Sequence, residues 1–448
     1  ENPPGYGLAH GRVCDRGAPI GPYGDPRPHF EAVRRLGQFL ALHGPRLLRT
    51  EPLADVAFGW YEPYEDCGQH GDMRLVGWRD DYRDMLTSRF GLCCDGTPRH
   101  GSDLLSLMAT SGLSFCMLDL ERDPLDEWLR IPQMWVCGLD FMSVAVQRNL
   151  IAYVERGGHL VMLPRVPYLD ERLQPCALLD ALYPARPLTP QPGWPTGHRR
   201  MPLHRVSLND GGDLCVADYV DTFELPAGAQ ALAWEWHSCR PSAYRRAYGR
   251  GTATLLGFTL GALGDSCLED QRFVNHLANR ARVRRHAACQ SLRLHVVERC
   301  TPPGAAEPTG FLFAVNPSAW PVRTRIAYTD PRTGEEAVLP RLMKGIELGG
   351  QGALILCLEA AIPGTNLTIA YSTSQVQDWS VDSGGRVSLT LHGPPDTMGE
   401  TAIRVRPHTA VPAVSPPART EQVTEDEGEL LIVTYPHHHG TTALRLQA

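Results

Sequence analysis

Hydrophobic residues in the first two thirds of the chain alternate between helical and extended spacing. Apolar side chains three and four residues apart predict a helix from His29 through Leu42, which Gly44-Pro45 should end. The same spacing predicts helices at 104–111, 140–155 and 270–285, while short β-forming runs predict strands at 55–60, 115–120, 133–137, 159–163, 216–223 and 248–258. The order helix, Gly157-Gly158, strand is typical of a doubly wound parallel sheet.

The pattern changes beyond Ala288 to short alternating runs separated by Gly, Pro and Asn. These runs predict strands at 292–297, 310–315, 324–328, 353–358 and 367–371, which is the rhythm of a β-sandwich. A second all-β segment is predicted from Trp379 onward, with strands at 387–391, 402–405 and 429–435 and a loop rich in proline and alanine at 407–417.

Composition narrows the class of function. A chain of 448 residues is long enough for two to four domains, and its formal charge of −7 offers no basic field for nucleic acid or a membrane surface. No apolar run reaches the length of a spanning helix. The thirteen cysteines lie mostly in apolar segments such as Phe115-Cys116-Met117, which predicts free thiols and a reducing, cytoplasmic location.

The N-terminal residues predict a piece of a larger barrel. A loop rich in Gly and Pro, the short strand Ala18-Pro19-Ile20 and the helix from His29 are typical of the last strand and helix of a (β/α)8 barrel. We therefore expect the other strands to lie upstream of Glu1. The helix should present Phe30, Val33, Leu36 and Leu40 as its apolar face and stay docked on the α/β domain, with the first 25 or so residues mobile.

Three motifs carry a resemblance to β-galactosidases. The run Asp15-Arg16-Gly17-Ala18-Pro19-Ile20, followed by Gly24 and Asp25, resembles the closing barrel strand of glycoside hydrolase family 35, although Cys14 and Arg16 stand where that family has tyrosines. Asn2 with Tyr6 is similar to a loop of the same enzymes, and Tyr153 to Val161 resembles the flavodoxin-like second domain of family 42, which is linked to trimer formation there.

The resemblance implies the C-terminal portion of a β-galactosidase-like glycoside hydrolase that lacks most of its catalytic barrel. The expected fold is α/β plus all-β: residues 1–50 a barrel remnant, 51–287 a flavodoxin-like α/β domain, 288–376 a β-sandwich and 377–448 a second β-domain. The resemblance also implies a homo-oligomer that binds a carbohydrate substrate, a β-galactoside or related β-glycoside.

Retaining glycosidases use two carboxylic acids, which in both families come from barrel strands before the last one. We therefore predict no catalytic residue within this chain and no activity for the chain alone. By position, Asn2, Tyr6 and Asp15 are candidate sugar contacts, because amide, phenol and carboxylate groups hydrogen-bond hydroxyls; the alternative is that they only shape loops.

The sequence gives less support to other functions. A non-catalytic carbohydrate-binding or subunit-assembly module is the second hypothesis. A cysteine hydrolase built on Cys137 is disfavoured because Trp135 and Leu139 stand where a nucleophile elbow needs small residues. No cofactor or metal is expected: the glycine pairs lack a phosphate-loop pattern, and His437-His438-His439 is predicted to be a solvated loop.

Overall fold

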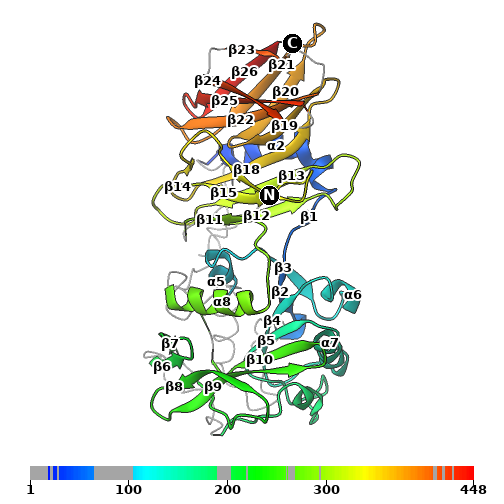
Figure 1. The fold of residues 1–448 in the computed structure, drawn as a ribbon, viewed down its shortest axis with the longest axis vertical. Helices are drawn as coiled ribbons and strands as arrows, with labels where there is room; N and C mark the ends of the chain where they lie inside the picture. The colour runs from blue at the N-terminus through cyan, green and yellow to red at the C-terminus, as the bar shows by residue number, and fades with distance from the viewer. Residues whose placement is uncertain are drawn as a thin grey trace. The chain divides into compact units, whose positions relative to one another are not determined.

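A computed structural model describes residues 19–20, 24–27, 30–64, 104–188, 203–217, 220–258, 260, 268–291, 294–406, 411–415, 419–425 and 428–447. The chain forms two compact units, mostly of β-sheet with few helices (Figure 1). The α/β unit is Pro52–Val297, and the β unit combines Glu1–Glu51 with Glu298–Ala448.

One nine-stranded sheet runs through the α/β unit in the order β3-β2-β4-β5-β10-β9-β8-β6-β7. The strands β3, β2, β4, β5 and β10 are parallel, whereas β9, β8, β6 and β7 are antiparallel. Parallel pairing follows from the near-continuous apolar runs of these strands, which suit burial on both faces. The bounds are β2 Val56–Trp60, β3 Phe115–Asp119, β4 Gln133–Gly138, β5 His159–Pro164, β6 Leu203–Leu208, β7 Asp213–Ala217, β8 Gln230–Glu235, β9 Arg240–Tyr248 and β10 Gly251–Leu256.

Helices cover both faces of the parallel strands. Side chains of α5 (Leu104–Thr110) and α8 (Leu268–Arg280) pack with Phe58, Trp135 and Val161 on one face. Helices α6 (Leu125–Trp128) and α7 (Val144–Glu155), with the 3-10 turn η2 (Leu178–Ala181), pack with Met134 and Met162 on the other (Figure 1). Because alternate strand residues point to opposite faces, both cores are apolar.

Close backbone approach fixes the junction between α7, β5 and β10. A Cβ atom added at Gly251 would lie 2.1 Å from the carbonyl oxygen of Gly158 and 2.5 Å from that of Val154. Both neighbours are backbone atoms, so they cannot move aside as a flexible side chain could. Glycine at this position is therefore required by space.

We expect Gly251→Ala to destabilise the α/β unit by about 2–3 kcal/mol, because the added methyl group forces the α7–β5 turn away from β10. Urea unfolding followed by amide hydrogen exchange of β5 and β10 would measure the change. Gly37→Ala is the control: this helical glycine has nothing within 4 Å of the added atom, and alanine should stabilise its helix by about 0.5–1 kcal/mol. Equal effects of the two substitutions would contradict the prediction.

The β unit packs a four-stranded sheet on an eight-stranded one. The larger sheet has the order β1-β12-β13-β18-β19-β22-β25-β24, and the smaller β20-β21-β26-β23. Shorter antiparallel pairings join β14 to β17 and β15 to β16. The bounds are β1 Glu51–Pro52, β12 His295–Cys300, β13 Gly310–Val315, β14 Val322–Thr324, β15 Ile326–Thr329, β16 Glu336–Leu339, β17 Ile346–Leu348, β18 Ala353–Ala361, β19 Leu367–Ser372, β20 Gln375–Val381, β21 Val387–His392, β22 Met398–Val405, β23 Ala413–Ser415, β24 Arg419–Glu425, β25 Gly428–Pro436 and β26 Thr441–Gln447. The short strand β11, Ala288–Cys289, falls within the range of the α/β unit.

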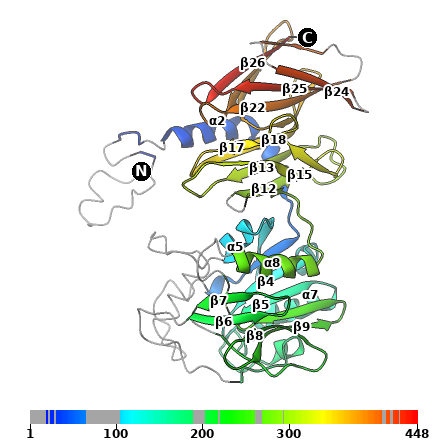
Figure 2. The same ribbon diagram turned by 60° about the vertical axis from the view of Figure 1, so that its left-hand side comes forward.

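Helix α2 (Phe30–Leu47) belongs to this β unit, which corrects its predicted docking on the α/β domain (Figure 2). Its buried residues are Phe39 and His43, and Phe39 joins the core between the two sheets. The predicted apolar face is largely exposed, with Val33, Leu36 and Leu40 between 42% and 47% accessible. The helix also continues through Pro45 to Leu47 instead of ending at Gly44-Pro45.

Two other predictions fail in the β unit. Part of the predicted loop at 407–417 forms a strand, β23, whose residues Ala413–Ser415 pair with β26. His437 is buried rather than solvated, because its ring hydrogen-bonds Ser374 Oγ at 2.8 Å and Thr397 Oγ1 at 3.0 Å. His438 and His439 are exposed as predicted.

Candidate functional site

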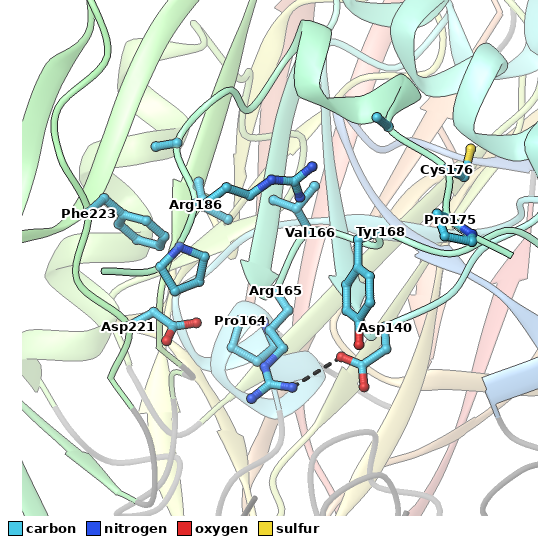
Figure 3. Close-up of a pocket in the computed structure, with 14 residues that line it drawn as sticks. Asp140, Pro164, Arg165, Val166, Tyr168, Pro175, Cys176, Arg186, Asp221 and Phe223 are labelled. Atoms are coloured by element: carbon cyan, nitrogen blue, oxygen red, sulfur yellow. Dashed lines mark hydrogen bonds and ion pairs between the residues drawn. The ribbon is translucent and has the colours of Figure 1, made fainter. Parts of the chain in front are cut away.

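A cavity of about 570 Å³ lies at the carboxyl ends of β4, β5 and β10 in the α/β unit. Most of its polar lining comes from the segments that follow β4 and β5, whereas Asp221 comes from the segment between β7 and β8, and Figure 3 shows these side chains around a common space. The lining residues are Asp140, Pro164, Arg165, Val166, Tyr168, Pro175, Cys176, Ala177, Ala185, Arg186, Pro187, Asp221, Phe223 and Leu255. Ligands of open α/β sheets bind outside the carboxyl ends of the strands, so this position favours a binding function.

A short loop after β4 places Asp140 in the cavity. Helix α7 was predicted to begin at Asp140, but it begins at Val144, because Ser143 caps it by accepting a hydrogen bond from the Val146 amide. The Asp140 carbonyl instead accepts the amides of Tyr168 and Leu169, each at 3.0 Å. The loop after β5 therefore holds the loop after β4, and Asp140 lies in this loop, before the helix begins.

Strands β4 and β5 approach closely where the loops leave the sheet. A Cβ atom at Gly138 would lie 2.2 Å from the carbonyl oxygen of Arg165. This contact brings Arg165 beside Asp140, and its guanidinium lies 3.1 Å from the carboxylate (Figure 3). Asp140 is only 5% exposed, so the ion pair forms one wall of the cavity at its buried side.

Two aromatic residues add apolar surface. Tyr168 is 45% exposed at the cavity, and Phe223 is buried in its wall (Figure 3). Burial, followed by the nearby Asp140 carboxylate, raises the pKa of the Tyr168 phenol above its ordinary value. The phenol is therefore a neutral hydrogen-bond donor at physiological pH.

The neighbouring position, between β2 and β4, is filled by aromatic side chains. Tyr61 and Tyr64 follow β2 and stack edge to face at 4.7 Å, and Tyr64 contacts Phe141 at 5.4 Å. The Tyr64 hydroxyl donates to the Phe141 carbonyl at 2.5 Å and accepts the Leu139 amide at 3.2 Å. These rings occupy the point where strand order reverses, and the open space lies further along, at β4, β5 and β10.

The predicted sugar contacts Asn2, Tyr6 and Asp15 lie outside the described residues. Cys137 lies within β4, 9% exposed and packed in a hydrophobic core, so it does not occupy a turn between strand and helix.

Sequence reasoning missed Asp140, Arg165, Tyr168 and Asp221. One signal was present: Asp140 and Arg165 come shortly after two strands that were predicted to be parallel, whose carboxyl ends must share an edge. Tyr168 and Asp221 had no such signal, because each reaches the cavity through irregular backbone.

The described residues were compared with the patterns expected of a metal site and of a membrane-spanning helix. Within the described part of the chain, three or more His, Cys, Asp or Glu side chains do not gather as metal ligands would. Among the same residues, the helices are too short or too polar to cross a membrane.

Several known proteins that act on carbohydrates are similar to this chain in sequence or in fold. A family model described as "GLMA-like, second domain" matches residues 95–187, which include part of the cavity lining. The chain is 29% identical over 374 residues to the exo-β-D-glucosaminidase of Pyrococcus horikoshii and 30% identical over 385 residues to that of Thermococcus kodakarensis. These alignments cover 83% and 85% of this chain but only 43% and 44% of the relatives, so the chain spans less than half their length.

A β-1,2-glucosyltransferase of Ignavibacterium album is 26% identical over 251 residues, covering 54% of this chain and 32% of that protein. Two solved structures share the fold at low identity. One is a GH42 β-galactosidase from G. stearothermophilus (17% identity, TM-score 0.51, covering 73% of this chain and 43% of that one). The other is the β-galactosidase of Bacillus circulans sp. alkalophilus (14%, TM-score 0.53, covering 76% and 46%). In sequence and in fold, the chain is glycoside hydrolase-like.

Proposed function

We propose that this chain is part of an exo-acting β-glycosidase that releases a terminal sugar, with β-D-glucosaminides as the first substrate class and β-galactosides as the second. The observation that carries the proposal is the similarity to two exo-β-D-glucosaminidases over 83% and 85% of the chain. This similarity extends beyond either structural unit, so it concerns the arrangement of the whole chain and not one common domain.

The catalytic acids are proposed to lie in a part of the protein outside this chain. Retaining hydrolysis needs two carboxyl groups about 5–5.5 Å apart, one as acid and base and the other as nucleophile. In the described cavity, Asp140 is engaged with Arg165, and Figure 3 shows this guanidinium on the side of Asp140 that faces Asp221. An ion-paired Asp140 is a poor candidate for either catalytic role, because each role needs a carboxyl group that faces the scissile bond.

The exposed stripe on α2 supports a larger parent protein. Val33, Leu36 and Leu40 are at least 42% accessible and lie on one side of the helix. The curated relatives are more than twice as long as their aligned part. We propose that the additional portion of the parent covers this stripe, as the resemblance of the N-terminal residues to a barrel strand and helix would require. The homo-oligomer stays a prediction.

We expect the 448-residue chain alone to hydrolyse neither a chromogenic β-D-glucosaminide nor a β-galactoside, because it would lack both catalytic acids. The parent protein should release the terminal sugar from at least one of them. The assay compares both proteins on both substrates and on the N-acetylated glucosaminide, with product stereochemistry followed by NMR. Turnover by the chain alone would place the acids within it and contradict the proposal.

The same assay separates two other functions. A glycosyltransferase, suggested by the third relative, would make a longer product when an acceptor sugar is added. A non-catalytic binding or assembly module would leave the parent protein without turnover on every substrate, while the chain could still bind sugar or self-associate. Release of free sugar, unaffected by an acceptor, supports hydrolysis.

A further inference from the structure

The cavity in the α/β unit has the dimensions and the lining of a ligand site. Its volume of about 570 Å³ lies within the range of small-molecule pockets, roughly 300–1,000 Å³. Most of the wall is apolar, with charged and phenolic groups at a few positions. We infer that this cavity is a non-catalytic binding site for a neutral carbohydrate, a mono- or disaccharide, held between the Asp140–Arg165 pair and the ring of Tyr168.

The charges in the wall favour a neutral ligand over an anion. Arg165 is paired with Asp140 at 3.1 Å, and Arg186 with Asp180 at 2.6 Å. Each guanidinium therefore already has a carboxylate partner, and a phosphate would have to displace it. The pairs still offer several N–H donors and carboxylate oxygens. A sugar hydroxyl both donates and accepts, so it matches a wall that presents both kinds of group without disturbing either pair.

The aromatic and proline residues supply the remaining part of a sugar site. Tyr168 presents a half-exposed ring, and the C–H face of a pyranose packs on such a surface while its hydroxyls point outward. Pro164, Pro175 and Pro187 form fixed walls beside it. Proline has no side-chain rotamers to lose, so binding against these walls carries a small entropic cost.

The inference is independent of where the catalytic acids lie. The described lining of the cavity lies within residues 140–255 of the α/β unit, so the 448-residue chain should bind sugar even where it hydrolyses none. Failure of hydrolysis by the parent protein would therefore leave this site intact, and failure of binding would leave the hydrolase proposal intact.

The test is ligand-observed NMR on the 448-residue chain, with cellobiose and lactose as neutral probes and inorganic phosphate as the anionic one. Sugars are titrated to about 50 mM, above the millimolar range in which weak sites saturate. We expect saturable binding of at least one disaccharide and no competition by phosphate. Absence of binding by both disaccharides, or displacement by phosphate, would overturn the inference.

Substitutions in the cavity wall test whether the disaccharide binds in this cavity. Tyr168→Ala removes the half-exposed ring and should weaken the disaccharide at least about tenfold, and Arg186→Ala, at a half-exposed side chain, should weaken it by a smaller factor. Trp236→Ala is the matched control, since Trp236 is an aromatic residue of the same unit, 47% exposed and outside the cavity. Circular dichroism checks that each variant is folded. Unchanged binding in both cavity variants, or an equal loss in the control, would place the sugar elsewhere and refute the assignment.

Discussion

Lowering the pH from 7 to 4 should destabilise the β unit by about 3 kcal/mol for each of two buried histidines, His43 and His437. Burial lowers the pKa of both rings from 6.5 to about 4. For His43 the Val376 carbonyl opposes this effect and Arg46 adds to it, and for His437 the neighbouring His392 adds to it. Both side chains are at most 1% exposed.

The sign follows from the direction of the shift. Each folded pKa lies below the unfolded value, so the unfolded chain takes up protons first as the pH falls. The stability contribution of each ring is fully present above pH 6.5 and is lost progressively toward pH 4. Ordinary carboxyl groups have pKa values of about 3.9 and 4.3, so they take up protons only at the lower end of this window. Amide hydrogen exchange of β18 and β22, corrected for the intrinsic pH dependence of exchange, would follow the β unit alone.

Substitution of His43 isolates the contribution of its ring. His43→Phe keeps an aromatic ring next to Phe39, which lies 4.5 Å away, but cannot take up a proton. We expect lower stability at pH 7, because the hydrogen bond with the Val376 carbonyl is lost, and a shallower decline toward pH 4. His438→Asn, at an exposed position two residues from β25, is the control. An unchanged pH profile in His43→Phe would show that His43 does not contribute to the decline.

We expect Glu400→Ala to destabilise the β unit by about 3–5 kcal/mol, because a buried charge-assisted hydrogen-bond network loses its acceptor. The Glu400 carboxylate is fully buried and accepts three consecutive amides, from Arg341 at 2.6 Å, Leu342 at 3.0 Å and Met343 at 2.9 Å. It also accepts the Tyr371 hydroxyl at 2.6 Å. Burial, followed by Glu400 itself, raises the pKa of Tyr371, so this hydroxyl remains a donor.

Two variants test the role of the charge. Glu347→Ala removes a carboxylate from a partly exposed ion pair with Arg323, and such pairs contribute about 0–1 kcal/mol. Glu400→Gln keeps the size and one oxygen but turns an amide group toward backbone donors, so its cost should fall between the two alanine variants. Denaturant unfolding with hydrogen exchange at residues 341–343 measures all three. A Glu400→Ala change as small as that of Glu347→Ala would contradict the prediction.

The sequence by itself determined the parts of this protein that depend on local pattern. Apolar runs at 133–137 and 159–163 are strands β4 and β5, and the alternating run Gly310–Val315 is β13. Gly157, with a φ of 117°, ends the α7 segment as predicted, because the turn needs a left-handed residue. Similarity of short motifs to β-galactosidases indicated a glycoside hydrolase-like protein, and the comparisons support that class.

Tertiary contacts decided the rest. Helix α2 continues past Pro45 because His43 contacts the Val376 carbonyl and Arg46 donates to the Ala361 carbonyl, each more than 300 residues away along the chain. His437 is buried next to the hydroxyl groups of Ser374, in the turn before β20, and Thr397, just before β22, which no periodicity reveals. Asp140 meets Arg165 because two loops hydrogen-bond across the ends of β4 and β5. Hydrophobic spacing encodes which faces are buried, but not which distant polar groups the fold brings together, and the candidate site depends on the latter.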